Sequence, residues 1–135
     1  MGASQVNRFI LVDTDVLIDV ARQISEAVDC LTKLEHQFVV SVSVITYMEL
    51  LIGCRNKTEL RNIDHFLQRF HVIRLNEMIC DVALDLLRQY RLSHGLLIPD
   101  ALIAATAIAM DLPLLTKNQS DYRFINGLQL LPYPG

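Results

Sequence analysis

The chain lacks the cysteine and histidine patterns of disulfide-rich and zinc-binding proteins. It has no C-x-x-C pair, and its odd number of cysteines is widely spaced: Cys30, Cys54 and Cys80. Its histidines show no zinc-ligand spacing: His36, His65, His71 and His94. We therefore predict buried thiols in a reducing compartment and no zinc site.

No segment is long and apolar enough to span a membrane. The longest apolar stretch, residues 101–110, falls well short of the roughly 20 residues that a bilayer needs, and acids flank it at Asp100 and Asp111. The N-terminus has no basic segment leading into an apolar run of leader length, so no signal peptide is predicted. We expect a cytoplasmic protein that makes no membrane contact.

The chain also lacks an excess of basic residues. Lys and Arg total 12 against 15 Asp and Glu, which gives a net charge of −3. This balance argues against broad non-specific binding of nucleic acid, because such binding uses a basic face. It does not exclude an enzyme that acts on nucleic acid, because divalent ions can neutralise clustered carboxylates locally.

What the chain has is apolar content in alternating strands and helices. Hydrophobic residues make up 52% of it and the mean hydropathy is +0.32, which suits a parallel sheet buried on both faces. Strands are predicted at 8–12, 38–40, 71–75, 112–116 and 128–131. Helices are predicted at 16–22, 25–36, 44–54, 59–70 and 77–94, with another opening at Pro99–Asp100. Asn76 is the predicted N-cap of the helix that ends near His94, and Gly95 suits the position after its end. The fold class is therefore α/β, with parallel β-α units in a single domain over residues 1–135.

Three acids occupy comparable settings in distant segments. Asp13 ends the first strand, whereas Glu49 and Asp100 are lone acids in apolar helical segments. Taken singly, Asp13 suits a helix N-cap, Glu49 a partner of Arg55, and Asp100 a charge at a helix N-terminus. Buried unpaired carboxylates are costly, however, and ligand sites lie beyond the carboxyl ends of parallel strands. Together the acids predict a metal site.

Four segments in order resemble the motifs of PIN-domain ribonucleases: residues 10–19, 43–53, 99–107 and 114–122. Their order and spacing are similar to those of the small VapC-type toxins of bacterial and archaeal toxin–antitoxin pairs. The resemblance covers nearly the whole chain. It implies a three-layer fold, in which a twisted parallel sheet of about five strands lies between helices.

The resemblance also implies an activity and a site. The activity is hydrolysis of RNA phosphodiester bonds with Mg²⁺ or Mn²⁺, which take hard oxygen ligands. The implied metal ligands, which also carry the catalysis, are Asp13, Glu49 and Asp100. The small hydroxyls that would support them are Thr14, Thr46 and Thr116, for which local helix capping is the alternative. The implied partners are an antitoxin and a second copy of the chain, which makes a homodimer.

Two positions depart from the family pattern. Asp15 stands where Asn is usual, and could join the metal site or face solvent. Asn118 stands where many members have an acid; it could still donate a carbonyl oxygen. Asp121, three residues further on, is predicted as the fourth catalytic and metal-binding acid, with capping of a turn as its alternative.

Two other functions fit part of the pattern. The run Asp13-Thr14-Asp15 has the acid-x-acid form of a haloacid-dehalogenase-type phosphotransferase, with Asp13 as nucleophile. Val16 and Leu17 replace the Gly-Thr expected there, and the chain is short for that fold plus a cap. A non-catalytic PIN-like interaction module is the other alternative, supported only by Asn118.

The sequence also predicts apolar helix faces that one small core leaves uncovered. Such faces mark partner sites when they are exposed. They comprise Leu60, Ile63, Phe66, Leu67 and Phe70 in one helix and Val82, Leu86 and Leu87 in another.

Overall fold

The protein is built on one parallel sheet of five strands. The computed structural model describes residues 8–133. The strands are β1 (Phe9–Val12), β2 (Val39–Ser43), β3 (His71–Ile73), β4 (Leu114–Leu115) and β5 (Leu130–Leu131). Their order across the sheet is β3-β2-β1-β4-β5, and every neighbouring pair is parallel. The expected parallel α/β sheet is thus confirmed.

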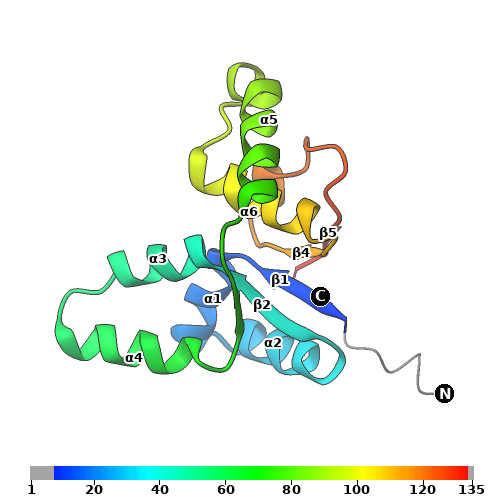
Figure 1. Cartoon of the computed structure of the whole chain (residues 1–135). Coiled ribbons are helices and arrows are strands. Elements are labelled where there is room, and N and C mark those ends of the chain that lie inside the picture. Colours follow the sequence, from blue (N-terminus) through cyan, green and yellow to red (C-terminus); the bar gives the residue numbers. More distant parts are fainter. Residues whose placement is uncertain (1–7, 134–135) are drawn as a thin grey trace.

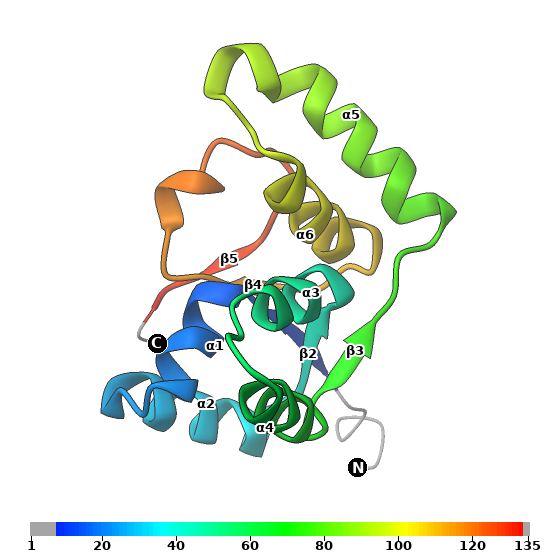
Figure 2. The same ribbon diagram turned by 90° about the vertical axis from the view of Figure 1, so that its left-hand side faces the viewer.

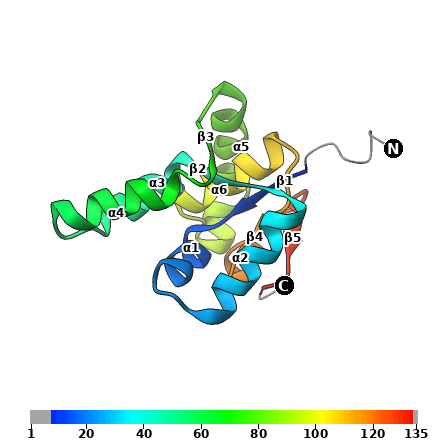
Figure 3. The ribbon, with the colours of Figure 1, turned by 90° about the horizontal axis from the view of Figure 1, so that it is seen from below.

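Helices cover both faces of this sheet. They are α1 (Thr14–Ala21), α2 (Ser25–Gln37), α3 (Val44–Ile52), α4 (Lys57–Leu67), α5 (Glu77–His94) and α6 (Ile98–Ala109), with a short 3-10 helix η2 (Gln119–Asp121). Figure 1 shows α5 and α6 above the sheet and α1 and α2 below it. The α3–α4 pair reaches away from the sheet, as the view from below also shows (Figure 3). None of these helices is long and apolar enough to cross a membrane.

Each sheet face has its own core because strand side chains alternate. Ile10 and Val12 of β1 pack toward α1 and α2, whereas Leu11 packs toward α5 and α6. Four alanines of α6 are completely buried, which lets this helix lie close to the sheet: Ala101, Ala104, Ala105 and Ala107. Figure 2 shows α6 between α5 and the strands.

Polar caps set where the helices begin. The side chains of Asp13, Ser43, Asn56 and Asn76 accept backbone N–H bonds at the starts of α1, α3, α4 and α5. Because Asp13 and Ser43 directly follow or end a strand, α1 and α3 begin at the carboxyl ends of β1 and β2 without a loop. The predicted caps at both ends of α5 are confirmed, since Gly95 adopts φ +69° after His94.

Several element boundaries differ from the prediction. α1 begins at Thr14 rather than Val16, because Asp13 caps it. β2 runs on to Ser43, beyond the predicted end at Val40. α4 covers 57–67 rather than 59–70, because Asn56 starts it early and a turn from Leu67 to Phe70 ends it. β4 and β5 keep only two paired residues each.

The expected uncovered helix faces are mostly buried. Leu67, Phe70 and Leu86 are each less than 9% exposed, because the apolar stripes of α4 and α5 turn toward the two cores. Leu60 of the first face is 39% exposed, and the other exposed large apolar side chains lie outside these faces. They include Ile52, Met78, Leu84, Leu92, Leu97 and Ile98.

Candidate metal centre

Asp13 is a buried carboxylate at the carboxyl end of β1. It is only 6% exposed. Its Oδ1 accepts the backbone N–H of Thr14 at 2.8 Å, and its Oδ2 accepts the Thr116 hydroxyl at 2.8 Å. Thr116 directly follows β4, the strand beside β1. The N-cap alternative is therefore correct for one oxygen, while the other faces a neighbouring strand end.

Glu49 is held by a threonine hydroxyl and not by a cation. The Thr14 Oγ1 donates to Glu49 Oε1 at 2.7 Å and lies 2.9 Å from the Thr46 Oγ1. A hydroxyl has one hydrogen, so Thr14 donates to the carboxylate and accepts from Thr46. Thr14 thus bonds Glu49 directly, and Thr46 bonds Thr14.

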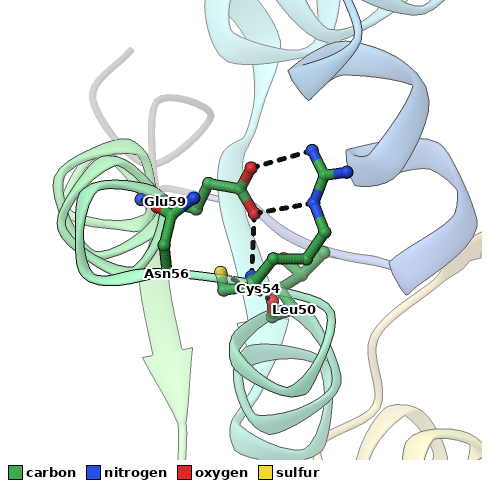
Figure 4. A network of polar contacts seen from close by, with 5 residues as sticks. Leu50, Cys54, Asn56 and Glu59 are labelled. Carbon is green, nitrogen blue, oxygen red and sulfur yellow. Dashed lines mark hydrogen bonds and ion pairs between the residues drawn. The ribbon is translucent and has the colours of Figure 1, made fainter.

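The expected alternative for Glu49, an ion pair with Arg55, is wrong. Arg55 is bound to Glu59 instead, with a guanidinium-to-carboxylate distance of 3.0 Å. Figure 4 shows Glu59 in this network, next to Asn56 and Cys54. The reason is local: Glu59 lies four residues after Arg55, near the start of α4, and it also accepts the backbone N–H of Arg55. Among residues 8–133, no cation pairs with Glu49.

Asp100 lies in the first turn of α6 and meets a tyrosine that the sequence reading did not single out. The Tyr122 hydroxyl donates to Asp100 Oδ1 at 3.2 Å, and the Tyr122 side chain is 1% exposed. The same hydroxyl lowers the pKa of Asp13, so it lies near both carboxylates. The only signal in the sequence was an aromatic residue beside Asp121, which does not reveal that its hydroxyl points at the acids.

Asp15 anchors the loop that follows β4. Its carboxylate accepts the backbone N–H groups of Asn118 at 3.0 Å and Lys117 at 3.3 Å, and it lies 3.4 Å from the Thr116 hydroxyl. The Lys117 ammonium also pairs with Asp19 at 2.9 Å. Of the two roles considered for Asp15, neither describes it fully: it is half-buried and holds a loop of the site in place.

Asn118 and Asp121 lie on this loop with exposed side chains. Neither side chain makes a hydrogen bond within the described part of the chain, and η2 has no side-chain cap. The Asp121 charge raises the pKa of Asp100, as do those of Glu49 and Asp15. Asp121 therefore lies within electrostatic reach of Asp100.

Mutual repulsion and burial together perturb these acids. Burial and then the neighbouring Asp15 charge raise the pKa of Asp13 from 3.8 to about 7, although hydrogen bonds from Thr116, Thr14 and Tyr122 lower it. Burial is also the main cause that raises the pKa of Asp100. Burial and then the Asp13 and Asp100 charges raise the pKa of the Tyr122 hydroxyl. The cluster therefore favours a bound proton or cation.

The donor set fits a hard divalent ion. All the side-chain groups that converge are carboxylates and hydroxyls, which suit Mg²⁺ or Mn²⁺ rather than softer metals. Between residues 8 and 133, no three acidic, histidine or cysteine side chains already surround a common point. Hydroxyls divide the carboxylates into two groups instead. Asp13 and Asp100 lie near the Tyr122 hydroxyl, and Glu49 lies with Thr14 and Thr46.

The geometry defines a three-layer α/β protein with clustered carboxylates at the carboxyl edge of a parallel sheet. The family model described as PIN domain matches residues 10–125. Ribonuclease VapC10 from Mycobacterium tuberculosis is 40% identical over 110 residues, which cover 81% of this chain and 82% of that protein. Ribonuclease VapC1 from Methanocaldococcus jannaschii is 31% identical over 126 residues, covering 92% and 86%.

A solved structure agrees with these relatives. A chain of a toxin–antitoxin complex from Klebsiella pneumoniae is 30% identical, superimposes with a TM-score of 0.74, and the match covers 91% of this chain and 96% of that one. The chain belongs to the PIN domain family, and the relatives that it resembles within this family are VapC proteins. The resemblance drawn from the four sequence segments is confirmed.

The raised pKa of Asp13 predicts a pH-dependent cost in stability. The folded protein holds the proton up to pH about 7 and the unfolded chain releases it near 3.8, so in EDTA the free energy of unfolding falls as the pH rises between these values. Three pKa units correspond to about 4 kcal/mol, and we expect about 2–4 kcal/mol. Asp13→Asn removes this fall and is the more stable protein at pH 8.

Urea unfolding at pH 5 and pH 8 measures the effect. Asp29→Asn, at an exposed carboxylate on α2, is the matched control and keeps the wild-type dependence. Parallel pH dependence in wild type and Asp13→Asn would show that Asp13 is not perturbed by burial.

Proposed function

We propose that this protein is a divalent-metal-dependent endoribonuclease of the VapC toxin type, which hydrolyses RNA phosphodiester bonds and is inhibited by a cognate antitoxin. One observation carries the proposal: Asp13, Glu49 and Asp100 lie among hydroxyl donors with no cation paired to them within residues 8–133. Acids kept this way are suited to bind a metal ion. The related ribonucleases support RNA as substrate.

The ion would be held by Asp13, Glu49 and Asp100, with Asp121 as a fourth acid. When bound, Mg²⁺ or Mn²⁺ lowers the pKa of a water nucleophile and offsets charge on the phosphate. The protein's own groups prepare this site. Thr116 and Tyr122 orient Asp13 and Asp100, Thr14 orients Glu49, and Asp15 fixes the loop that carries Asn118 and Asp121.

The two alternatives have less support. A phosphotransferase with Asp13 as nucleophile would carry Gly-Thr where Val16 and Leu17 stand, and residues 10–125 match the PIN domain instead. A non-catalytic module would not need to keep unneutralised acids together, because these destabilise the fold. Calorimetric titration with Mn²⁺ distinguishes the non-catalytic module from the metal-dependent nuclease, since an inactive module shows no binding above background.

This protein offers the proposed antitoxin a groove that reaches the acid site at Glu49. This groove of about 520 Å³ lies between α1, α3 and α4 and includes Glu49 and Glu59. Its apolar walls include Ile18, Leu50, Ile63 and Phe66. Glu59 is already paired with Arg55, and Arg22 also lines the groove, so Glu49 is its acid without a paired cation. Apolar walls beside Glu49 fit a helix that presents an apolar face and a basic side chain. The toxin–antitoxin complex from Klebsiella pneumoniae supports a partner of this kind.

The surface proposed for the homodimer contact is not the groove proposed for the antitoxin. Leu84, Leu97 and Ile98 are exposed beside an apolar groove of about 780 Å³ between α5 and α6, with Arg88 and Arg91 at its rim. An exposed apolar patch of this kind marks a partner site. This surface differs from the α4 and α5 faces expected from the sequence, most of which are buried or half-buried against the cores.

Three predictions test the proposed function, and the first of them concerns the metal ion. RNA cleavage requires Mg²⁺ or Mn²⁺ and stops in EDTA. Asp13→Asn and Asp100→Asn each lower the cleavage rate by at least about 100-fold, because losing a ligand forfeits several kcal/mol of charge stabilisation in the transition state. Circular dichroism shows both variants folded, and Asp29→Asn retains activity. Full cleavage in EDTA, or by Asp13→Asn, contradicts the mechanism.

The second prediction concerns the fourth ligand. In a Mn²⁺ titration of cleavage, Asp121→Asn raises the metal concentration at half-maximal rate, because it removes a charge that faces Asp100. Asn118→Asp lowers this concentration, because it adds a carboxylate to the same loop. Should Asp121→Asn leave the midpoint unchanged and reduce only thermal stability, Asp121 has a structural role in η2 and is not a ligand.

The third prediction concerns assembly. Leu97→Arg with Ile98→Glu places charges on the α5–α6 surface and shifts the protein from dimer to monomer, while Ile52→Glu on α3 leaves the dimer intact. Sedimentation velocity at micromolar concentration measures both. A wild-type protein that sediments as a single monomeric species contradicts the homodimer.

A further inference from the structure

Three aromatic side chains form a stacked group at the end of α5. The rings of His94 and Phe124 lie nearly parallel, with centroids 4.1 Å apart and an angle of 11° between planes. Tyr90 meets both rings edge-on, 5.9 Å from His94 and 5.2 Å from Phe124. We call His94, Phe124 and Tyr90 the aromatic platform.

The outer face of the His94 ring is open. The side chain is exposed, and Phe124 covers only one of its two faces. Tyr90 does not cover the other face, because a ring there would lie farther from Phe124 than from His94, and Tyr90 lies nearer Phe124. The Ser93 hydroxyl contacts the ring edge, 2.7 Å from Nδ1. A flat ring is thus presented to solvent on a firm support.

The aromatic platform is tied to the acid cluster through one short loop. Tyr122 reaches Asp100 at 3.2 Å, and Phe124 is only two residues further on, at most about 7 Å along the backbone. The loop is fixed again at Asn126, whose backbone N–H donates to the Tyr90 hydroxyl at 3.2 Å. The platform is therefore held at both ends of the loop that begins at Tyr122, the residue bonded to Asp100.

Two arginines, Arg91 and Arg123, lie close in sequence to the aromatic platform, although the chain as a whole carries a charge of −3. Arg91 precedes His94 by one turn and donates to the backbone carbonyls of Gly95 and Leu96, which leaves its charge unneutralised by an acid. Arg123 lies between Tyr122 and Phe124 and is exposed. An open aromatic face next to cations suits single-stranded nucleic acid, whose bases stack on such rings while its phosphates contact the cations.

We propose that the aromatic platform is a substrate subsite, on which an unpaired base of the RNA stacks against His94 beside the scissile phosphate. The inference rests on the proposed ribonuclease function. It names the part of the substrate that is recognised, a single-stranded nucleotide, and the face that recognises it. The stack extends from Phe124 through His94 to the base.

Steady-state cleavage of a fluorescein-labelled single-stranded RNA in Mn²⁺ tests the subsite. Base stacking on an aromatic ring is worth a factor of about 5 to 100 in affinity, so His94→Ala raises KM by about that factor. kcat changes less than about twofold, because the acids are untouched. His94→Phe restores a stacking face and keeps KM within about threefold of wild type. His36→Ala, at an exposed histidine on α2, is the matched control.

Each contrary outcome has a distinct meaning. If His94→Ala has the wild-type KM, or His94→Phe raises KM as much as His94→Ala does, no base stacks there. If His94→Ala leaves KM unchanged but dissociates the dimer in sedimentation, the aromatic platform is a protein interface and the inference is wrong. If wild type cleaves no RNA in Mn²⁺, the proposed function itself fails, and this subsite fails with it.

Discussion

Electrostatic repulsion between carboxylates at one edge of the sheet is the constraint on which the site depends. Burial is the main cause that raises the pKa of Asp13 and of Asp100; the Asp15 charge adds to it at Asp13, and the Asp121, Glu49 and Asp15 charges add to it at Asp100. Neutral donors bind these carboxylates, namely the hydroxyls of Thr14, Thr116 and Tyr122. A hydroxyl orients a carboxylate without cancelling its charge, whereas an arginine would cancel it. The arginine closest in sequence to Glu49 is instead bound to Glu59, so the negative potential is preserved.

The fold brings these groups together because residues of the site themselves stand where the strands end. Asp13 ends β1, caps α1 and contributes to the cluster, so no intervening loop can move it relative to the sheet. Thr116 performs the matching role at the end of β4, next to β1. The loop after Thr116 is longer, and two acids on successive turns of α1 hold it: Asp15 through backbone N–H groups and Asp19 through Lys117. The strand ends and this anchored loop therefore act as one rigid edge.

The sequence was sufficient for what depends on local pattern and order. Apolar runs and caps predicted the five strands and the helices α1 to α6 of residues 8–133, and lone acids, one at a strand end and two in apolar helical segments, led to the prediction that Asp13, Glu49 and Asp100 share a site. The sequence was insufficient where a side chain contacts a residue far away along the chain. Tyr122 meets an acid 22 residues away, and Asp15 meets a loop more than 100 residues away. No local periodicity records these choices, because they follow from how α6 and the loop after β4 pack on the same edge.

The position of Glu49 links the two binding events that the proposed function requires. It belongs to the acid cluster through Thr14, and it also lines the groove between α1, α3 and α4. A basic side chain that enters this groove and reaches Glu49 would satisfy the charge that otherwise attracts the metal ion. The two ligands would then compete for one carboxylate, and linkage requires each to weaken the other by the same factor. Inhibition would therefore come from loss of ion affinity as well as from exclusion of RNA, and it would weaken as the concentration of the divalent ion rises.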